Sequence, residues 1–205
     1  MTSRYERHPS HVLDSAPVPV GHRLRNMRSA PAGIADIIGA TGPNPEHAEA
    51  LMLFGQFVGG WDVDARVHAP DGTVRTLRGE WHFFWVLEGR AIQDVILTPV
   101  RAERDPAKWR MGDYQTAIRF YRPEDGTWDV TAISPPFNQV HRLVARKVGD
   151  RIVLEGTRPD GTPQRWSFND ISATTLHWRG EVSRDGGQSW TIEEEMTLTR
   201  MQARR

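Results

Sequence analysis

The chain of 205 residues contains no cysteine, no long apolar run and no excess of either charge. The lack of cysteine excludes disulfides and cysteine-based metal or redox sites, and it suits a reducing compartment. No segment approaches the roughly 18 apolar residues of a membrane-spanning helix, and the first residues lack the apolar run of a signal peptide. We therefore expect a cytoplasmic protein without membrane contact.

Several chemical signatures are also absent. Lys+Arg and Asp+Glu each number 26, so no basic face for nucleic acid is predicted. The sequence has no Gly-x-Ser-x-Gly, P-loop or dinucleotide-binding motif, and its histidines are scattered without metal-ligand spacing. We expect no cofactor, no metal and no nucleic-acid partner.

The N-terminal 43 residues differ from the rest of the chain. They show little periodicity and many prolines, and we interpret residues 1–43 as an extended arm preceding a domain at 44–205. The arm has apolar side chains that could pack on the outside of the domain, either in the same chain or in a second copy in a homodimer. A solvated tail remains the alternative.

A short helix should follow the arm. Asn44 is placed to cap it, Pro45 suits the first helical position and Glu46 the first turn. The helix should run to about Phe57 with one apolar side.

From Trp61 the hydrophobic period changes to two, with turn signals such as Pro70-Asp71-Gly72 between the segments. The predicted strands are 61–68, 75–86, 90–98, 115–122, 127–133, 140–148, 151–158, 163–171, 174–183 and 190–200. No helix-length segment interrupts them. We predict an all-β fold, a closed antiparallel up-and-down β-barrel of about ten strands, with the arm and one short helix before it.

The opening and the close of this meander resemble those of the calycin superfamily. The Gly-x-Trp of Gly59-Gly60-Trp61 and the basic Arg200 match the positions where calycins cover a first-strand Trp with a last-strand basic residue. The strand count resembles the fatty-acid-binding-protein and nitrobindin branch. Related bacterial lipocalin-like barrels similarly show the turn Leu87-Glu88-Gly89-Arg90. The resemblance implies a barrel that encloses one small ligand.

Strand parity predicts which side chains point inward. If Trp61 faces the interior, residues of the same parity on 61–68 do too. If Arg200 covers Trp61 from inside, then Glu194 also faces the interior, where a carboxylate must be paired or its pKa rises.

The strand at 174–183 leaves two alternatives. Either His177, Arg179 and Glu181 face the interior, or Trp178 does and the charges are solvated. The length of the turn to the last strand decides this, and simple apolar-in patterning favours Trp178.

Asp94 and Arg119 each interrupt an apolar strand. As an interior pair they would form a polar anchor for a ligand carboxylate or carbonyl. A cross-strand ion pair on the surface is the alternative.

Aromatic residues occupy both faces of the segment 75–86. Trp81, Phe83 and Trp85 share one face, which should line the interior as filler or as the wall of a binding pocket. The other face would then need a cover from the arm or a second subunit.

Three functions follow from these features. The first hypothesis is binding of a small, mostly apolar, aromatic or lipid-like molecule by Trp81, Phe83, Trp85, Arg119, Trp178, Arg179 and Glu181. The second is a cofactor-independent cyclase, isomerase, lyase or hydratase with Asp94, His177 and Glu194 as catalytic residues. The third is haem binding in the nitrobindin manner through His141 or His177. The glycine signature that nitrobindins carry after the first Trp is missing here, which argues against haem.

Overall fold

The structure is a computed structural model, and it describes residues 39–105, 107 and 113–202. The greater part of the arm, residues 1–38, lies outside these ranges. Within them no helix is long and apolar enough to cross a membrane.

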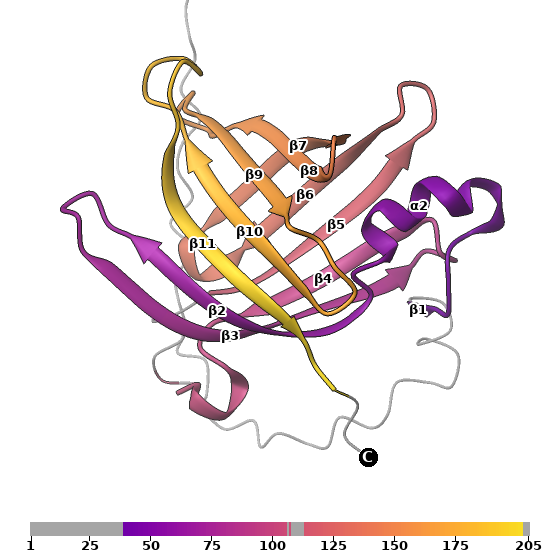
Figure 1. The fold of residues 1–205 in the computed structure, drawn as a ribbon, viewed down its shortest axis with the longest axis horizontal. Coiled ribbons are helices and arrows are strands. Elements are labelled where there is room, and N and C mark those ends of the chain that lie inside the picture. The colour runs from indigo at the N-terminus through magenta and orange to yellow at the C-terminus, as the bar shows by residue number, and fades with distance from the viewer. Residues whose placement is uncertain (1–38, 106, 108–112, 203–205) are drawn as a thin grey trace, which may run out of the picture.

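The described chain forms an antiparallel barrel of ten strands, each paired with the next along the sequence (Figure 1). Pairing of the last strand with the first closes it. The barrel strands are β2 (Gly59–His68), β3 (Val74–Val86), β4 (Ala91–Leu97), β5 (Tyr114–Arg122), β6 (Thr127–Ser134), β7 (Gln139–Val148), β8 (Arg151–Thr157), β9 (Pro163–Asn169), β10 (Thr175–Val182) and β11 (Thr191–Arg200).

These strands confirm the predicted fold class and lie within two residues of the predicted ranges. The alternation of apolar and polar residues predicts these ranges because each strand has one face in the core and one in water. The burial of β2 follows this period, with Trp61, Val63 and Ala65 buried and the residues between them exposed.

A helical segment closes one end of the barrel. A 3-10 turn, η1 (Pro45–His47), leads into α2 (Ala48–Gly55), and the Asn44 side chain accepts a hydrogen bond from the amide of Glu46 at 3.1 Å. The predicted cap is therefore confirmed. Good helix formers continue the helix, and it ends two residues before the predicted Phe57.

Helix α2 and the residues that follow it insert aromatic side chains into the barrel. Phe54 and Phe57 are fully enclosed, and Phe57 stacks on Phe168 with ring centroids 5.0 Å apart. Each such ring contributes about 1.5–3 kcal/mol through burial. The helix end of the interior is thus filled rather than open.

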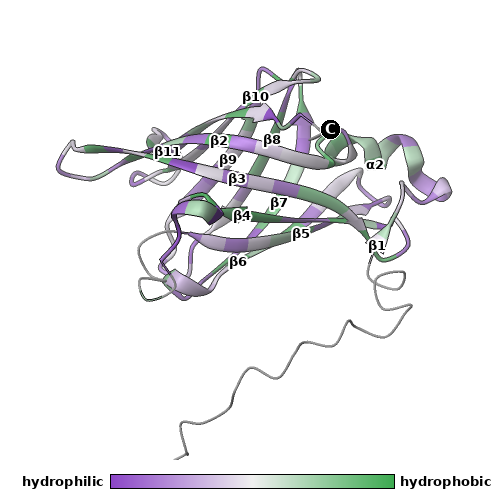
Figure 2. Ribbon diagram, turned by 90° about the horizontal axis from the view of Figure 1, so that it is seen from below, coloured by the Kyte–Doolittle hydropathy of each residue, from purple (hydrophilic) through white to green (hydrophobic). Residues whose placement is uncertain are grey.

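A two-residue strand, β1 (Gly39–Ala40), pairs with the end of β3 at Val86 and Trp85. Here β3 extends past its partner β2, whose first residue pairs with Phe83. The chain therefore enters the described structure beside the β3–β4 turn. Figure 2 shows β1 at the same end of the barrel as α2.

Candidate functional site

The two ends of the barrel differ in composition. Helix α2 covers one end, while the turns between β2 and β3, β6 and β7, β8 and β9, and β10 and β11 gather at the other. Figure 1 shows the helix and the β10–β11 hairpin at opposite ends. We call the end away from the helix the far end.

The middle of the interior holds a buried ion pair. Asp94 on β4 and Arg119 on β5 contact each other through their side chains, which are 1% and 2% exposed. The guanidinium lies between the rings of Phe54 and Phe83, at 5.0 and 5.3 Å from their centroids. Burial raises the pKa of Asp94, and the positive charge of Arg119 opposes that rise. Asp94 and Arg119 therefore form an interior pair and not a cross-strand ion pair on the surface.

The interior face of β3 is aromatic, as predicted. Trp81, Phe83 and Trp85 are all buried, and Trp81 stacks on Phe83 at a centroid distance of 5.0 Å. The Trp81 indole N–H favours ionisation of Asp94, although it makes no well-formed hydrogen bond to any described residue.

Glu194 faces the interior at the far end, as parity predicted. Its neighbours in the sheet are Val67 on β2 and Gly180 on β10. The Trp178 ring lies over Gly180, with its Cη2 atom 2.7 Å from where a Cβ would stand. Trp178 therefore packs beside Gly180, the residue that pairs with Glu194. Trp178 points inward, as the apolar pattern favoured.

The carboxyl group of Glu194 has no hydrogen bond or ion pair to any described residue. Burial raises its pKa from 4.5 to about 7, and the negative charges of Asp113 and Glu193 add to this rise. Part of the side chain still reaches solvent. Glu194 is thus a shielded carboxyl that changes charge near neutral pH.

Other polar groups gather at the same end. His141 on β7 bonds to the Gln164 side chain on β9 through Nδ1 at 2.9 Å, and burial lowers the pKa of the imidazole. Asp113 accepts a hydrogen bond from the Ser134 hydroxyl at 2.7 Å, and burial raises the pKa of its carboxyl.

We call Asp113, His141, Gln164 and Glu194 the polar cluster. The Nε2 atom of Gln164 is buried and has no hydrogen-bond partner within the described ranges. Buried amide donors are nearly always satisfied, so this one indicates a place for a water or a ligand atom. Two carboxyls, a neutral imidazole and a free amide donor can bind polar groups and can exchange protons.

A row of aromatic rings runs inward from the polar cluster. Trp166 lies 5.1 Å from His141 and 5.7 Å from Trp178, and Trp178 lies 6.2 Å from Trp81, measured between ring centroids. We call Trp166, Trp178 and Trp81 the aromatic row. It offers apolar contact area directly beside the polar groups.

Three predicted site residues lie elsewhere. His177, Arg179 and Glu181 point outward on β10, because Leu176, Trp178 and Val182 take the inward positions. His177 bonds to Asp170 at 2.9 Å and Glu181 to Arg165 at 3.0 Å on this outer surface. The fold therefore does not place His177, Arg179 and Glu181 in the barrel interior.

Sequence reasoning missed most of the polar cluster. His141 shares strand parity with Leu143 and Ala145, whose inward position could have identified it. Asp113 follows a long connection, and nothing in its neighbourhood signals burial. In the described part of the chain, no three His, Asp or Glu side chains are grouped so as to hold a metal ion.

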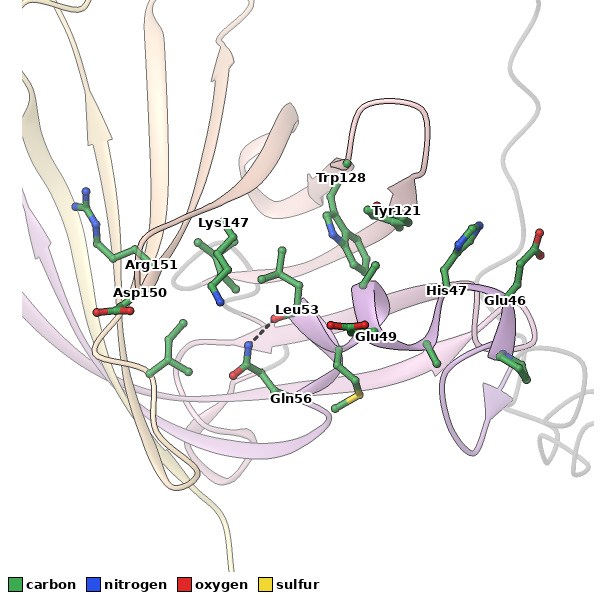
Figure 3. Close-up of a pocket in the computed structure, with 17 residues that line it drawn as sticks. Glu46, His47, Glu49, Leu53, Gln56, Tyr121, Trp128, Lys147, Asp150 and Arg151 are labelled. Carbon is green, nitrogen blue, oxygen red and sulfur yellow. Dashed lines mark hydrogen bonds between the residues drawn. The ribbon is translucent and has the colours of Figure 1, made fainter.

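A separate groove of about 1010 Å³ lies outside the barrel, between α2 and the turns that follow β5 and β7. Figure 3 shows Glu46 and Glu49 on the helix side and Lys147 and Arg151 on the barrel side. None of the predicted site residues lines it.

Comparison with known proteins supports the fold alone. No protein-family model and no curated protein matches the chain. The crystal structure of Rv2717c from M. tuberculosis is similar with a TM-score of 0.53 at 18% identity, over 78% of this chain and 99% of that one. The S-type phycobiliprotein lyase CPES from Guillardia theta is similar with a TM-score of 0.55 at 10% identity, over 79% of this chain and 100% of that one.

Proposed function

We propose that this protein binds a small, mostly apolar molecule inside the barrel at the far end. The observation that carries the proposal is Glu194, an inward carboxyl without a partner at the start of a row of tryptophans. A carboxyl group is expensive to shield from water unless something compensates it. A ligand that meets Glu194 with a polar atom and covers Trp166 and Trp178 with its apolar body would supply that compensation.

The barrel type supports the same proposal by analogy. One of the similar structures is named as an S-type phycobiliprotein lyase. The ligand class proposed for this chain is aromatic or lipid-like, because the row offers ring faces and the polar groups are few. Affinity would come from apolar burial, at about 25 cal/mol per Å².

Fluorescence titration tests the proposal directly. Fatty acids, terpenoids and aromatic acids are titrated at pH 6 and pH 8 while tryptophan emission and the melting temperature are followed. A true ligand should quench the emission and raise the melting temperature. Its affinity should change at least severalfold in Glu194→Gln and remain unchanged in Glu195→Gln. Glu195 is the matched control because it lies on the outer face of β11, bonded to His68.

The titration also reports the charge of the ligand. A ligand carboxylate should bind more weakly at pH 8, where Glu194 is ionised, and a cationic ligand more tightly. If no compound of the panel quenches emission or shifts the melting temperature at either pH, the binding proposal fails.

A second candidate function is acid–base catalysis at the same end. It rests on the pKa of Glu194 near 7, which lets one group accept and donate a proton at neutral pH. His141 is a second titratable group at the far end, and burial lowers the pKa of its imidazole. Of the catalytic residues predicted from sequence, Glu194 alone is retained here: Asp94 is paired with Arg119, and His177 faces outward.

Deuterium exchange tests this catalytic proposal without knowledge of the product. Compounds that bind are incubated with the protein in D2O, and loss of their acidic C–H signals is followed by NMR. Catalysis predicts exchange or product formation that Glu194→Gln slows at least a hundredfold and Glu195→Gln does not. Compounds that bind and stay unchanged would leave binding as the function.

A further inference from the structure

The outer face of β4 to β7 carries exposed apolar side chains. Its large exposed members are Tyr114, Phe120, Ile133, Phe137 and Val140, which are 42–51% exposed. Pairing joins some of them across strands: Val95 faces Thr116, which faces Ile133, which faces Val140. We call this surface the apolar face. Figure 2 shows β3, β4 and β5 side by side on this side of the barrel.

Charge is missing from the middle of the apolar face. The outward residues of β4 are Ala91, Gln93, Val95 and Leu97, and those of β5 from Tyr114 to Phe120 are Thr116 and Ile118 besides these two ends. Among the described residues of this face, Arg142 lies at its border, while Asp129 lies beside Phe120, with which it pairs. A contiguous apolar surface of this kind marks a contact site.

The N-terminal arm enters the structure at the end of β3, on the edge of that strand opposite β4, so β3 separates its entry point from this face. Gly39 pairs with Val86 beside the β3–β4 turn, where Leu87 is 55% exposed. Phe120, at the same end of the face, is paired with Ala91 just after that turn. Thirty-eight residues precede Gly39, with apolar side chains at Val12, Leu13, Val18, Val20, Leu24, Met27, Ile34, Ile37 and Ile38.

The length of the arm is sufficient to cover the apolar face. From β1 to β7 are five strand spacings, or about 24 Å, and the face runs roughly 13–20 Å along the strands. An extended chain advances about 3.3 Å per residue, so eight to twelve residues suffice. Ile37 and Ile34 would reach Phe120, and Leu24 and Met27 would reach Ile133 and Val140.

We propose that residues 1–38 dock on the apolar face of their own barrel, with Leu24 to Ile37 over β4 to β6. The entry point, the reach of the chain and the spacing of its apolar residues all fit this face. The inference is independent of the ligand-binding proposal, because the face lies outside the barrel.

Paramagnetic labelling of the full chain tests the proposal. The chain has no cysteine, so each variant carries one label. A nitroxide is attached at Ile133→Cys on the apolar face or at Thr197→Cys on the outer face of β11, which serves as the matched control. Docking predicts at least fivefold loss of amide signal from residues around Leu24 to Ile37 with the first label and little loss with the second.

Two further samples keep the test decisive. A label at Arg142→Cys, on the border of the face, avoids disturbing the contact and should give the same broadening. Mixing nitrogen-15 protein with labelled unenriched protein reports only contacts between copies. Docking on the own barrel predicts little broadening in this mixture, and broadening there as strong as in the uniformly labelled sample, after allowing for the fraction of labelled chains, would overturn it in favour of a second copy. Equal broadening from the Ile133 and Thr197 labels, or none from Ile133 and Arg142, would also overturn the proposal.

Discussion

Arg200 lies over the indole of Trp61, with its guanidinium carbon 4.2 Å from the ring centroid. The same group donates hydrogen bonds to the carbonyl oxygens of Val58 at 3.0 Å and Gln56 at 2.8 Å. The Trp61 indole in turn donates to the carbonyl of Phe57 at 2.8 Å. Since β11 pairs with β2 at Arg200 and Trp61, one contact joins the seam of the barrel to the chain that leaves α2.

Replacing Arg200 by methionine should destabilise the protein by about 2–4 kcal/mol, because three carbonyls lose a charged donor and the ring loses its cation. The third carbonyl is that of Ala173, bonded at 2.7 Å. Urea denaturation measures the change. Arg179→Met, on the outer face of β10, is the control and should stay within about 0.5 kcal/mol of the parent. Equal stabilities of the two variants would contradict the role given to Arg200.

Asp94→Asn should cost about 3–5 kcal/mol, since it leaves the Arg119 guanidinium buried without a counter-charge. The double variant Asp94→Leu with Arg119→Met removes both charges and should recover at least half of that loss. Chemical denaturation of Asp94→Leu, Arg119→Met and the double variant completes the cycle, with Asp94→Asn measured beside them. A double variant as unstable as the sum of its parts would show that the two charges do not depend on each other.

Glu194 should make stability depend on pH between about 4.5 and 7. Its folded pKa is raised, so the folded state holds the proton more tightly than the unfolded state. Its favourable contribution is complete below the unfolded pKa of about 4.5 and is lost as pH rises through about 7, by up to about 3 kcal/mol. Glu194→Gln should flatten this decline and Glu195→Gln should keep it, as measured by denaturation at a series of pH values.

Gly55→Ala should lower stability by about 1–3 kcal/mol, although alanine favours helices. A Cβ at this position would lie 2.5 Å from the ring of Trp85, which is itself buried. Gly42→Ala is the control, because nothing lies within 4 Å of its added Cβ. Thermal melts of both variants decide the matter, and a Gly55→Ala protein as stable as the control would mean that α2 can shift freely.

The sequence predicts much of the fold because its signals are local. Alternation and turn residues define each strand without reference to its neighbours, and the Trp61 parity carries through the closing strand to Glu194. This alternation of inward and outward side chains does not extend past Glu194. The register between β10 and β11 shifts between Gly180 and Glu181. Ile192 therefore pairs with the outward residue Glu181, and it does not continue the inward positions of Leu198, Met196 and Glu194.

The candidate site was harder to predict because it depends on contacts between distant segments. The buried setting of the Asp94–Arg119 pair includes Phe54, which comes from the helix and lies against the Arg119 guanidinium. Asp113 and Glu194 come close only after the barrel closes, and neither Asp113 nor His141 has a sequence motif of its own. Patterning did favour an inward Trp178, because its apolar neighbours on β10 outweigh the charges between them.

Closure through β2 and β11 also constrains how the chain acquires this structure. The backbone groups on the free edge of β2 find their hydrogen-bond partners only when β11 pairs with it. Folding therefore depends on a contact between distant ends of the domain. Trp81 of β3 packs against Phe168 on β9 and Trp178 on β10, so during synthesis this ring stays uncovered until those late strands have left the ribosome. Intermediates that lack β11 should be prone to aggregate.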